Sequence, residues 1–291
     1  MTLRPFSLSA VLVTAALGGG CDVRVGEHGV SVDVASGKAI DDWTRTYRLT
    51  TGGAVEIINV NGPIVVEAAH GPEVEIRATL VARGGSDVEA RELLKAVEIK
   101  EDIAPGRVAV QTVTGSGVVF GRRSVSVEYR LRVPAGLQVS VKTGNGGIGL
   151  HDVNGTIVAS TTTGGVRGTN LSGGVSAHIV NGGIVMDVAR VAGPIELESV
   201  NGGIRLDMPA DVNADLEAHT VNGGVATDDN LKINASERSR TRLAGRLNRG
   251  GTRISVNTVN GGVRLRVRDG SVSRDAQGGD EAGEVRLERG R

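Results

Sequence analysis

Short apolar stretches alternate with polar residues along most of the chain, and glycine-containing turns separate them. Alternate positions of a β-strand lie on one face, so between about residues 44 and 134 this pattern predicts strands. They are expected at Arg45 to Leu49, Ala54 to Val60, Ile64 to Ala68, Val74 to Ala82, Arg107 to Val113 and Ser124 to Val133.

One helix is expected in the same section. Ser86-Asp87-Val88-Glu89 has the sequence of a capping box, in which the hydroxyl and the carboxylate each bind a free backbone N–H. Leu93, Leu94 and Val97 follow with the spacing of an apolar helix face.

An internal repeat extends from about residue 135 to residue 267. Its corners Asn145, Asn154, Thr163, Ser172 and Asn181 lie nine residues apart, and each is followed by Gly and then, two places on, by Ile or Val. The motif resumes at three later asparagines. The predicted structural turn residues are Asn145, Asn154, Asn181, Asn201, Asn222 and Asn260, with Gly146, Gly182, Gly202, Gly223 and Gly261.

A unit of nine residues cannot enclose its own apolar side chains, whereas stacked units share one core. We therefore predict an all-β, β-helix-like solenoid with coils of about 18 to 20 residues, each made of two units. Asn-Gly suits corners that need positive φ, and stacked corners allow ladders of Asn amides. An antiparallel stack of hairpins is the alternative, because Asn-Gly also favours hairpin turns.

The phase of the unit predicts which side chains are buried. The apolar residues before the corners, such as Val180, Val200, Val221 and Val259, are expected to share the core with the aliphatic residues after them. Polar residues such as Thr220, Glu198 and Arg205 are expected to face water.

The N-terminus predicts an export signal. Arg4 precedes a 12-residue apolar stretch from Phe6 to Leu17, which is too short to span a bilayer. Gly18, Gly19 and Gly20 then precede Cys21, the single cysteine. Cys21 resembles the lipidated cysteine of bacterial lipoproteins, although Gly18 stands where that pattern has Leu. An ordinary cleaved signal of a secreted protein is the alternative.

The repeat resembles a known family. "RVPAGLQVSVKTGNGGI" (132 to 148) leads into serial "VNGGI" corners, and this combination is similar to the bacterial envelope domain of unknown function 4097/4098, an adhesin-like group. The resemblance covers roughly residues 45 to 267. It implies a β-solenoid and an envelope location, and it implies no established reaction.

The composition limits the chemistry that we expect. Net charge is zero and aromatic residues are 2%, which argues against nucleic-acid partners. A calcium roll needs carboxylates in its turns, and only Gly146 to His151 approaches that motif, with His in the ligand position. The five histidines lack metal-ligand spacing, no carboxylate pair stands out, and "GSGVVFG" is not a phosphate loop. We therefore expect no cofactor, metal or catalytic residue.

The sequence divides into five parts. They are a signal peptide (1–20), a tether (21–43), an N-terminal β-rich section (44–134), the repeat solenoid (135–267) and a flexible tail (268–291). The predicted protein is a non-catalytic envelope lipoprotein that is anchored to the membrane through Cys21 and binds an unknown envelope protein or glycan. Alternatives are a purely structural scaffold and a carbohydrate-active β-helix enzyme.

Overall fold

The computed structural model describes residues 21–26, 29–34, 37–114 and 123–268. The expected signal peptide, most of the expected tail and the "GSGVVFG" segment lie outside these residues. Within them the protein is all-β with one helix, as predicted. Strands β1 (Cys21–Gly26) and β2 (Gly29–Val34) form an antiparallel pair, and the strands from β3 to β21 form one 19-stranded sheet.

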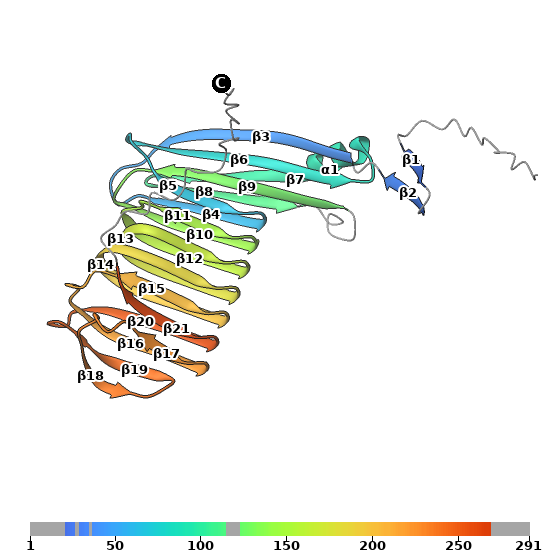
Figure 1. Cartoon of the computed structure of the whole chain (residues 1–291). Helices are drawn as coiled ribbons and strands as arrows, with labels where there is room; N and C mark the ends of the chain where they lie inside the picture. The colour runs from blue at the N-terminus through green and yellow to red at the C-terminus, as the bar shows by residue number, and fades with distance from the viewer. Residues whose placement is uncertain (1–20, 27–28, 35–36, 115–122, 269–291) are drawn as a thin grey trace, which may run out of the picture.

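The large sheet winds into a solenoid with two walls of parallel strands (Figure 1). The first wall contains β8 (Arg107–Thr114), β4 (Ala54–Asn61), β10 (Leu137–Asn145), β12 (Gly155–Thr163), the second halves of β13 (Val166–Asn181) and β14 (Ile184–Asn201), β20 (Thr252–Asn260) and β16 (Ala214–Asn222). The second wall contains β9 (Ser124–Val133), β5 (Ile64–Ala68), β11 (Ile148–His151), the first halves of β13 and β14, β15 (Ile204–Met208), β21 (Val263–Val267) and β17 (Val225–Thr227).

The coil length follows from the register of the strands. Leu137 pairs with Gly155 and Ile148 with Val166, so one coil takes 18 residues. Aliphatic side chains from both walls point inward and form one continuous core, in which Ile57, Leu150, Ile184 and Leu206 are fully buried. The expected N-terminal section and the expected solenoid share this core. The two sections are joined because β4 pairs with β10 and β5 pairs with β11.

The last coils do not stack in sequence order. Strand β20 lies between β14 and β16, and β21 lies between β15 and β17. The coil of residues 252–267 is thus inserted between two coils that precede it in the chain. The sequence repeat does not reveal this order, because all three coils carry the same corner motif.

Antiparallel strands cover both ends of the stack (Figure 1). They are β7 (Val97–Ala104) beside β8, β6 (Glu73–Gly84) and β3 (Gly37–Arg48) beyond β9, and β19 (Arg242–Leu247) and β18 (Ile233–Arg238) beyond β16. The edge strand β3 is blocked by side chains, since Asp87 accepts from the Lys38 N–H and Asp41 from the Asp42 N–H. Such blocking opposes edge-to-edge association.

One prediction for this region needs correction, and one strand was missed. Residues 37–43 belong to β3 rather than to a tether, because they pair with residues 78–84 of β6. Strand β7 was not predicted, since only Val97 and Ile99 of its side chains are partly buried and its pattern is mostly polar.

Helix α1 (Asp87–Lys95) confirms the predicted helix and half of the capping box, but Val97, which was expected on the helix face, begins β7. The Ser86 hydroxyl accepts from the Glu89 N–H at 3.2 Å. The Glu89 carboxylate instead accepts from the N–H of Gly85, at 2.7 Å, one residue before the predicted donor. The helix packs on β6 through the buried Ala90.

Candidate functional site

The Asn-Gly corners at the end of the first wall lie in one row. Successive strands pair Asn61 with Asn145, then Thr163, Asn181, Asn201, Asn260 and Asn222. Four of these side chains form an amide ladder, in which each Nδ2 donates to the preceding Oδ1. The bonds run from Asn201 to Asn181 (2.9 Å), Asn260 to Asn201 (2.8 Å) and Asn222 to Asn260 (2.8 Å).

Two of the sequence-predicted residues lie elsewhere. Asn154 bridges to Ser172 in a second row, at the opposite corner of the coil. Cys21 begins strand β1, where its backbone pairs with Val34. Neither Asn154 nor Cys21 therefore belongs to the amide ladder.

The glycines of the corner row approach one another closely. Gly146, Gly164, Gly182 and Gly202 have φ between 135° and 159°. A Cβ atom on any of them would collide with the carbonyl oxygen of the glycine in the neighbouring coil. Gly223 and Gly261 have the same close contact. Only glycine fits this spacing, because any side chain would push two coils apart.

A row of buried hydroxyls, absent from the predicted site, supports the corners. The donors stand two residues before the corner and bind the carbonyl of a stacked glycine. The pairs are Thr143 with Gly62, Thr161 with Gly146, Ser199 with Gly182, Thr258 with Gly202 and Thr220 with Gly261, at 2.7–3.1 Å. Thr220 is thus fully buried, contrary to the prediction that it faces water. The recurring Thr or Ser two places before Asn was the available signal.

The valines directly before these corners point outward, so the predicted burial of Val180, Val200, Val221 and Val259 is wrong. Val60, Val180, Val200, Val221 and Val259 are 40–53% exposed. We call Val180, Val200, Val259 and Val221 the valine stripe, because they lie on adjacent strands in that order. At the second row of corners the corresponding Val153 and Leu171 are buried, as predicted.

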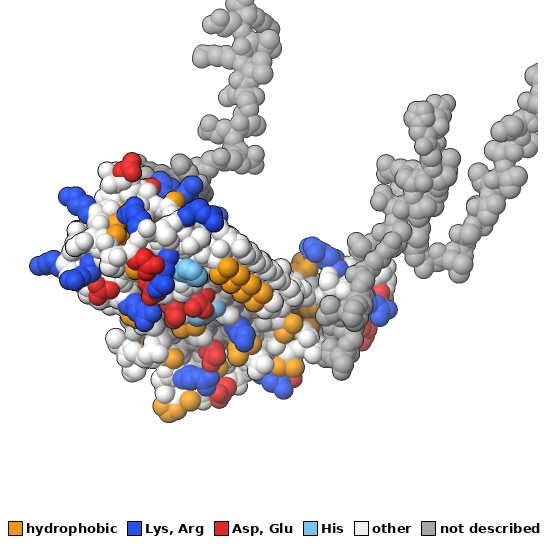
Figure 2. Space-filling view, turned by 90° about the horizontal axis from the view of Figure 1, so that it is seen from below, with side chains coloured by type: hydrophobic (Ala, Val, Ile, Leu, Met, Phe, Trp, Pro, Cys, Tyr) orange, Lys and Arg blue, Asp and Glu red, His pale blue; other side chains and the backbone are white. Residues whose placement is uncertain are grey.

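A groove of about 430 Å³ runs beside the valine stripe on the outer surface of the first wall. Figure 2 shows this row of hydrophobic side chains with histidines next to it. His178 and His219 line the groove. His178 contacts Ser176 at 2.9 Å through Nε2 and Glu198 at 3.1 Å through Nδ1. The groove thus combines an apolar side with groups that can donate or accept hydrogen bonds.

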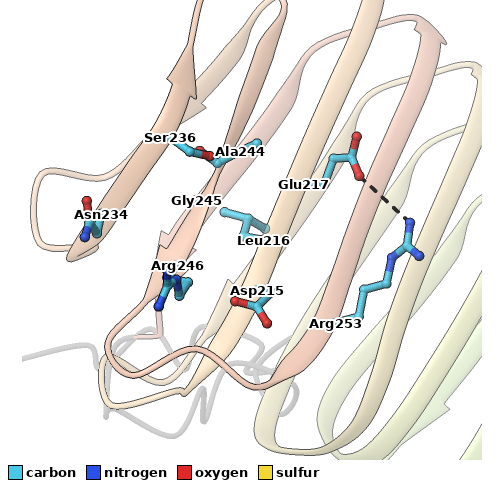
Figure 3. A pocket seen from close by; sticks show the side chains of 9 residues that line it. All are labelled: Asp215, Leu216, Glu217, Asn234, Ser236, Ala244, Gly245, Arg246 and Arg253. Carbon is cyan, nitrogen blue, oxygen red and sulfur yellow. Dashed lines mark hydrogen bonds and ion pairs between the residues drawn. The ribbon is translucent and has the colours of Figure 1, made fainter.

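A charged hollow of about 510 Å³ lies at the end of the same wall and is lined by residues of β20, β16, β19 and β18 (Figure 3). Asp215 and Glu217 project from β16 toward it, with Arg246 and Arg253 on the neighbouring strands. Glu217 pairs with Arg242 at 3.0 Å and with Arg253 at 3.8 Å. Its carboxylate is therefore held in ion pairs, an arrangement that favours a stabilising role over acid–base chemistry.

Carboxylates also line the outer surface of the second wall. Asp187 and Asp207 lie side by side in register on β14 and β15. Asp187 binds Arg268 at 2.6 Å, and Asp207 binds Arg205 at 3.2 Å. Burial raises the pKa of Asp207, and the nearby Asp187 raises it further, whereas Arg205 lowers it. Each acid has an arginine partner, which fits a structural ion-pair network.

The described residues offer neither a cluster of metal ligands nor a membrane-spanning helix. No group of three or more His, Cys, Asp or Glu side chains in this part of the chain could hold a metal ion. Within the part of the chain that the structure describes, no helix is long and apolar enough to cross a membrane.

Comparison with curated proteins finds no match. Among solved structures, a "putative cell adhesion protein" from Clostridium sporogenes has 9% identity and a TM-score of 0.48, and the match covers 79% of this chain and 100% of that one. A "putative adhesin" from Bacteroides fragilis has 7% identity and a TM-score of 0.29, with 78% and 97% covered. A "putative lipid binding protein" from Parabacteroides distasonis has 9% identity and a TM-score of 0.27, with the same coverage.

The family comparison covers the solenoid. The sequence profile of the family described as Toastrack DUF4097 matches residues 50–266, which include every coil from β4 to the last strand of the stack. This match confirms the resemblance drawn from the "VNGGI" corners, and the protein belongs to the Toastrack DUF4097 family.

Proposed function

We propose that this protein is a non-catalytic, adhesin-like envelope lipoprotein that binds a partner on the outer surface of its first wall. The observation that carries the proposal is the valine stripe. Four valines in register, each at least 40% exposed, border a groove lined by His178 and His219. Contiguous exposed apolar residues with a polar rim are typical of interaction sites.

The architecture supports a binding role. Stacked Asn-Gly-Gly corners serve as the repeating unit of a rigid platform, on which the stripe and the groove extend across several coils. Each row repeats with the spacing of neighbouring strands, about 4.8 Å, which suits an elongated partner. An envelope protein or a glycan has this form, and the groove offers both apolar and hydrogen-bonding contacts to it.

A lipid on Cys21 would attach the platform to a membrane, facing the periplasm or the cell surface. Stable anchoring takes two signals, such as two acyl chains, because one acyl chain alone binds a bilayer weakly. The β1–β2 pair directly after Cys21 would then separate the anchor from the solenoid.

The test is a binding experiment with the full mature chain without lipid. Fluorescently labelled protein is titrated onto envelope material, prepared separately as protein and as glycan fractions. The Val200→Lys/Val259→Lys variant should lose at least about tenfold in affinity, because two lysines disrupt an apolar contact worth about 1.5 kcal/mol or more. Val88→Lys is the matched control, since Val88 is 67% exposed on α1, far from the stripe in sequence.

The outcomes separate the alternatives. Saturable binding by the native protein and the control, lost in the stripe variant, supports the proposal. Equal binding by all three excludes the stripe as the site. Absence of any saturable binding would favour the purely structural scaffold.

A further inference from the structure

Asn-Gly sequences carry a chemical liability. The backbone nitrogen of the glycine can attack the Asn side-chain carbonyl, because glycine has no side chain to hinder the approach. This chain has seven such pairs, at Asn61, Asn145, Asn154, Asn181, Asn201, Asn222 and Asn260. The six in the corner row differ in how the stack restrains the attacking nitrogen.

Inside the stack the attacking nitrogen is hydrogen-bonded. The N–H of each corner glycine donates to the carbonyl oxygen of the corner residue in the next coil. Among the Asn-Gly pairs these bonds join Gly62 to Asn145, Gly146 to Thr163, Gly182 to Asn201, Gly202 to Asn260 and Gly261 to Asn222, at 2.7–3.0 Å. An attack at any of these corners must first break a bond between two coils.

The last corner lacks this restraint. Asn222 ends the row, and the Gly223 N–H has no hydrogen-bond partner among the described residues. On this corner Arg240 binds the Gly223 carbonyl oxygen at 2.7 Å and leaves the nitrogen unengaged. The Asn222 side chain is exposed, and its Nδ2 is held by a single bond to Asn260.

We propose that Asn222 is a site of spontaneous deamidation, whereas the five other Asn-Gly corners of this row are protected by stacking. The Gly223 nitrogen loses its proton to solvent and forms a bond to Cγ of Asn222. The tetrahedral intermediate takes up a proton and releases ammonia, leaving a succinimide. Water then adds to one of the two succinimide carbonyls and opens the ring to aspartate or isoaspartate, so one water is consumed for each ammonia released.

The product changes the end of the corner row. A carboxylate at position 222 cannot donate to Asn260 Oδ1, so the last bond of the amide ladder is lost. It also places a negative charge beside Val221, the last valine of the stripe. The isoaspartate product adds a backbone carbon between β16 and β17 and so lengthens the corner that joins the two walls.

The experiment follows mass shifts at each Asn-Gly pair in the folded, full-length protein. The protein is incubated in mildly alkaline buffer, digested, and the peptides are sequenced by mass spectrometry. We expect Asn222 to convert at least about tenfold faster than Asn201 or Asn260, which corresponds to one hydrogen bond of about 1.4 kcal/mol. In denaturant the rates should become similar, because only the fold distinguishes these corners.

Asn222→Gln is the matched control variant, because glutamine forms the equivalent ring far more slowly. The peptide that contains residue 222 should then keep its mass, which excludes Asn213 and Asn230 as the source. Conversion of Asn222 no faster than that of Asn260 in the folded protein would overturn the proposal. So would an unchanged mass shift in the Asn222→Gln peptide.

Discussion

The Thr258 hydroxyl donates a hydrogen bond of 2.8 Å to the carbonyl oxygen of Gly202, 56 residues earlier in the chain. The bond joins two stacked coils at a corner where the glycine backbone has no side chain to shield it. Thr220 makes the equivalent bond to Gly261 in the next coil. These buried hydroxyls therefore connect neighbouring coils by hydrogen bonds, in addition to the packing of the core side chains.

Replacing Thr258 with valine should lower the free energy of unfolding by about 1 kcal/mol, the usual net value of one hydrogen bond. A larger loss is not expected, because Ile179 occupies the same row without a hydroxyl. Urea unfolding measures the change. Thr162→Val is the control, since Thr162 is exposed and should give almost no difference. Equal losses for both variants would contradict a specific role for the buried hydroxyl.

Gly182→Ala should destabilise the solenoid by roughly 3 kcal/mol or more. Gly182 has φ of 152°, and backbone strain of this kind costs about 1–3 kcal/mol for other residues. In addition, the new Cβ would collide with the Gly164 carbonyl oxygen. Thermal unfolding of Gly71→Ala provides the comparison, because no atom lies within 4 Å of a Cβ at that position. A Tm for Gly182→Ala close to that of Gly71→Ala would show that the corner relaxes easily.

Stability should fall between about pH 10 and pH 12 because of Tyr129. Burial raises the pKa of this phenol from 10.0 to about 12, and its hydrogen bond with Thr112 opposes the rise. In this range the unfolded chain loses the phenol proton while the native state keeps it, so folding becomes less favourable with rising pH. The loss amounts to at most about 3 kcal/mol. Tyr129→Phe should flatten this part of the curve of Tm against pH; an unchanged slope would exclude Tyr129 as its source.

Metabolic labelling with a fatty acid tests the proposed anchor. The native protein should carry label, and Cys21→Ala should carry none, because Cys21 is the only thiol in the chain. Retention of label by the variant would exclude lipidation of Cys21. An unlabelled native protein that is released into the medium would favour ordinary secretion.

Local patterns in the sequence predict much of the fold. The all-β class, the helix after Ser86 and the strands that become β4, β5, β8 and β9 follow from alternation and capping, which are properties of neighbouring residues. Val200 shows where alternation misleads. Alternation predicts that Val200 is buried together with Ile204. The two residues lie in different walls on either side of a corner, so the alternation of buried and exposed positions in one strand does not continue into the next.

Features that depend on distant segments could not be predicted. Asn201 contacts Asn260 rather than Asn222, although Asn222 is the next corner in the sequence. Any order of these coils satisfies the same local motif. The groove and the charged hollow also result from stacking, because Glu217 meets Arg253 only through the inserted strand β20.

The inserted coil has a consequence for biosynthesis. Ile195 pairs with Ile254 across a long stretch of chain, so the nascent protein cannot complete the solenoid until residues 252–267 have left the ribosome. Until then the newly made edge of β14 exposes unpaired backbone groups, and such edges favour aggregation. Folding from the N-terminus can therefore proceed coil by coil only as far as β15, and the last coils can stack only after β20 and β21 have been synthesised.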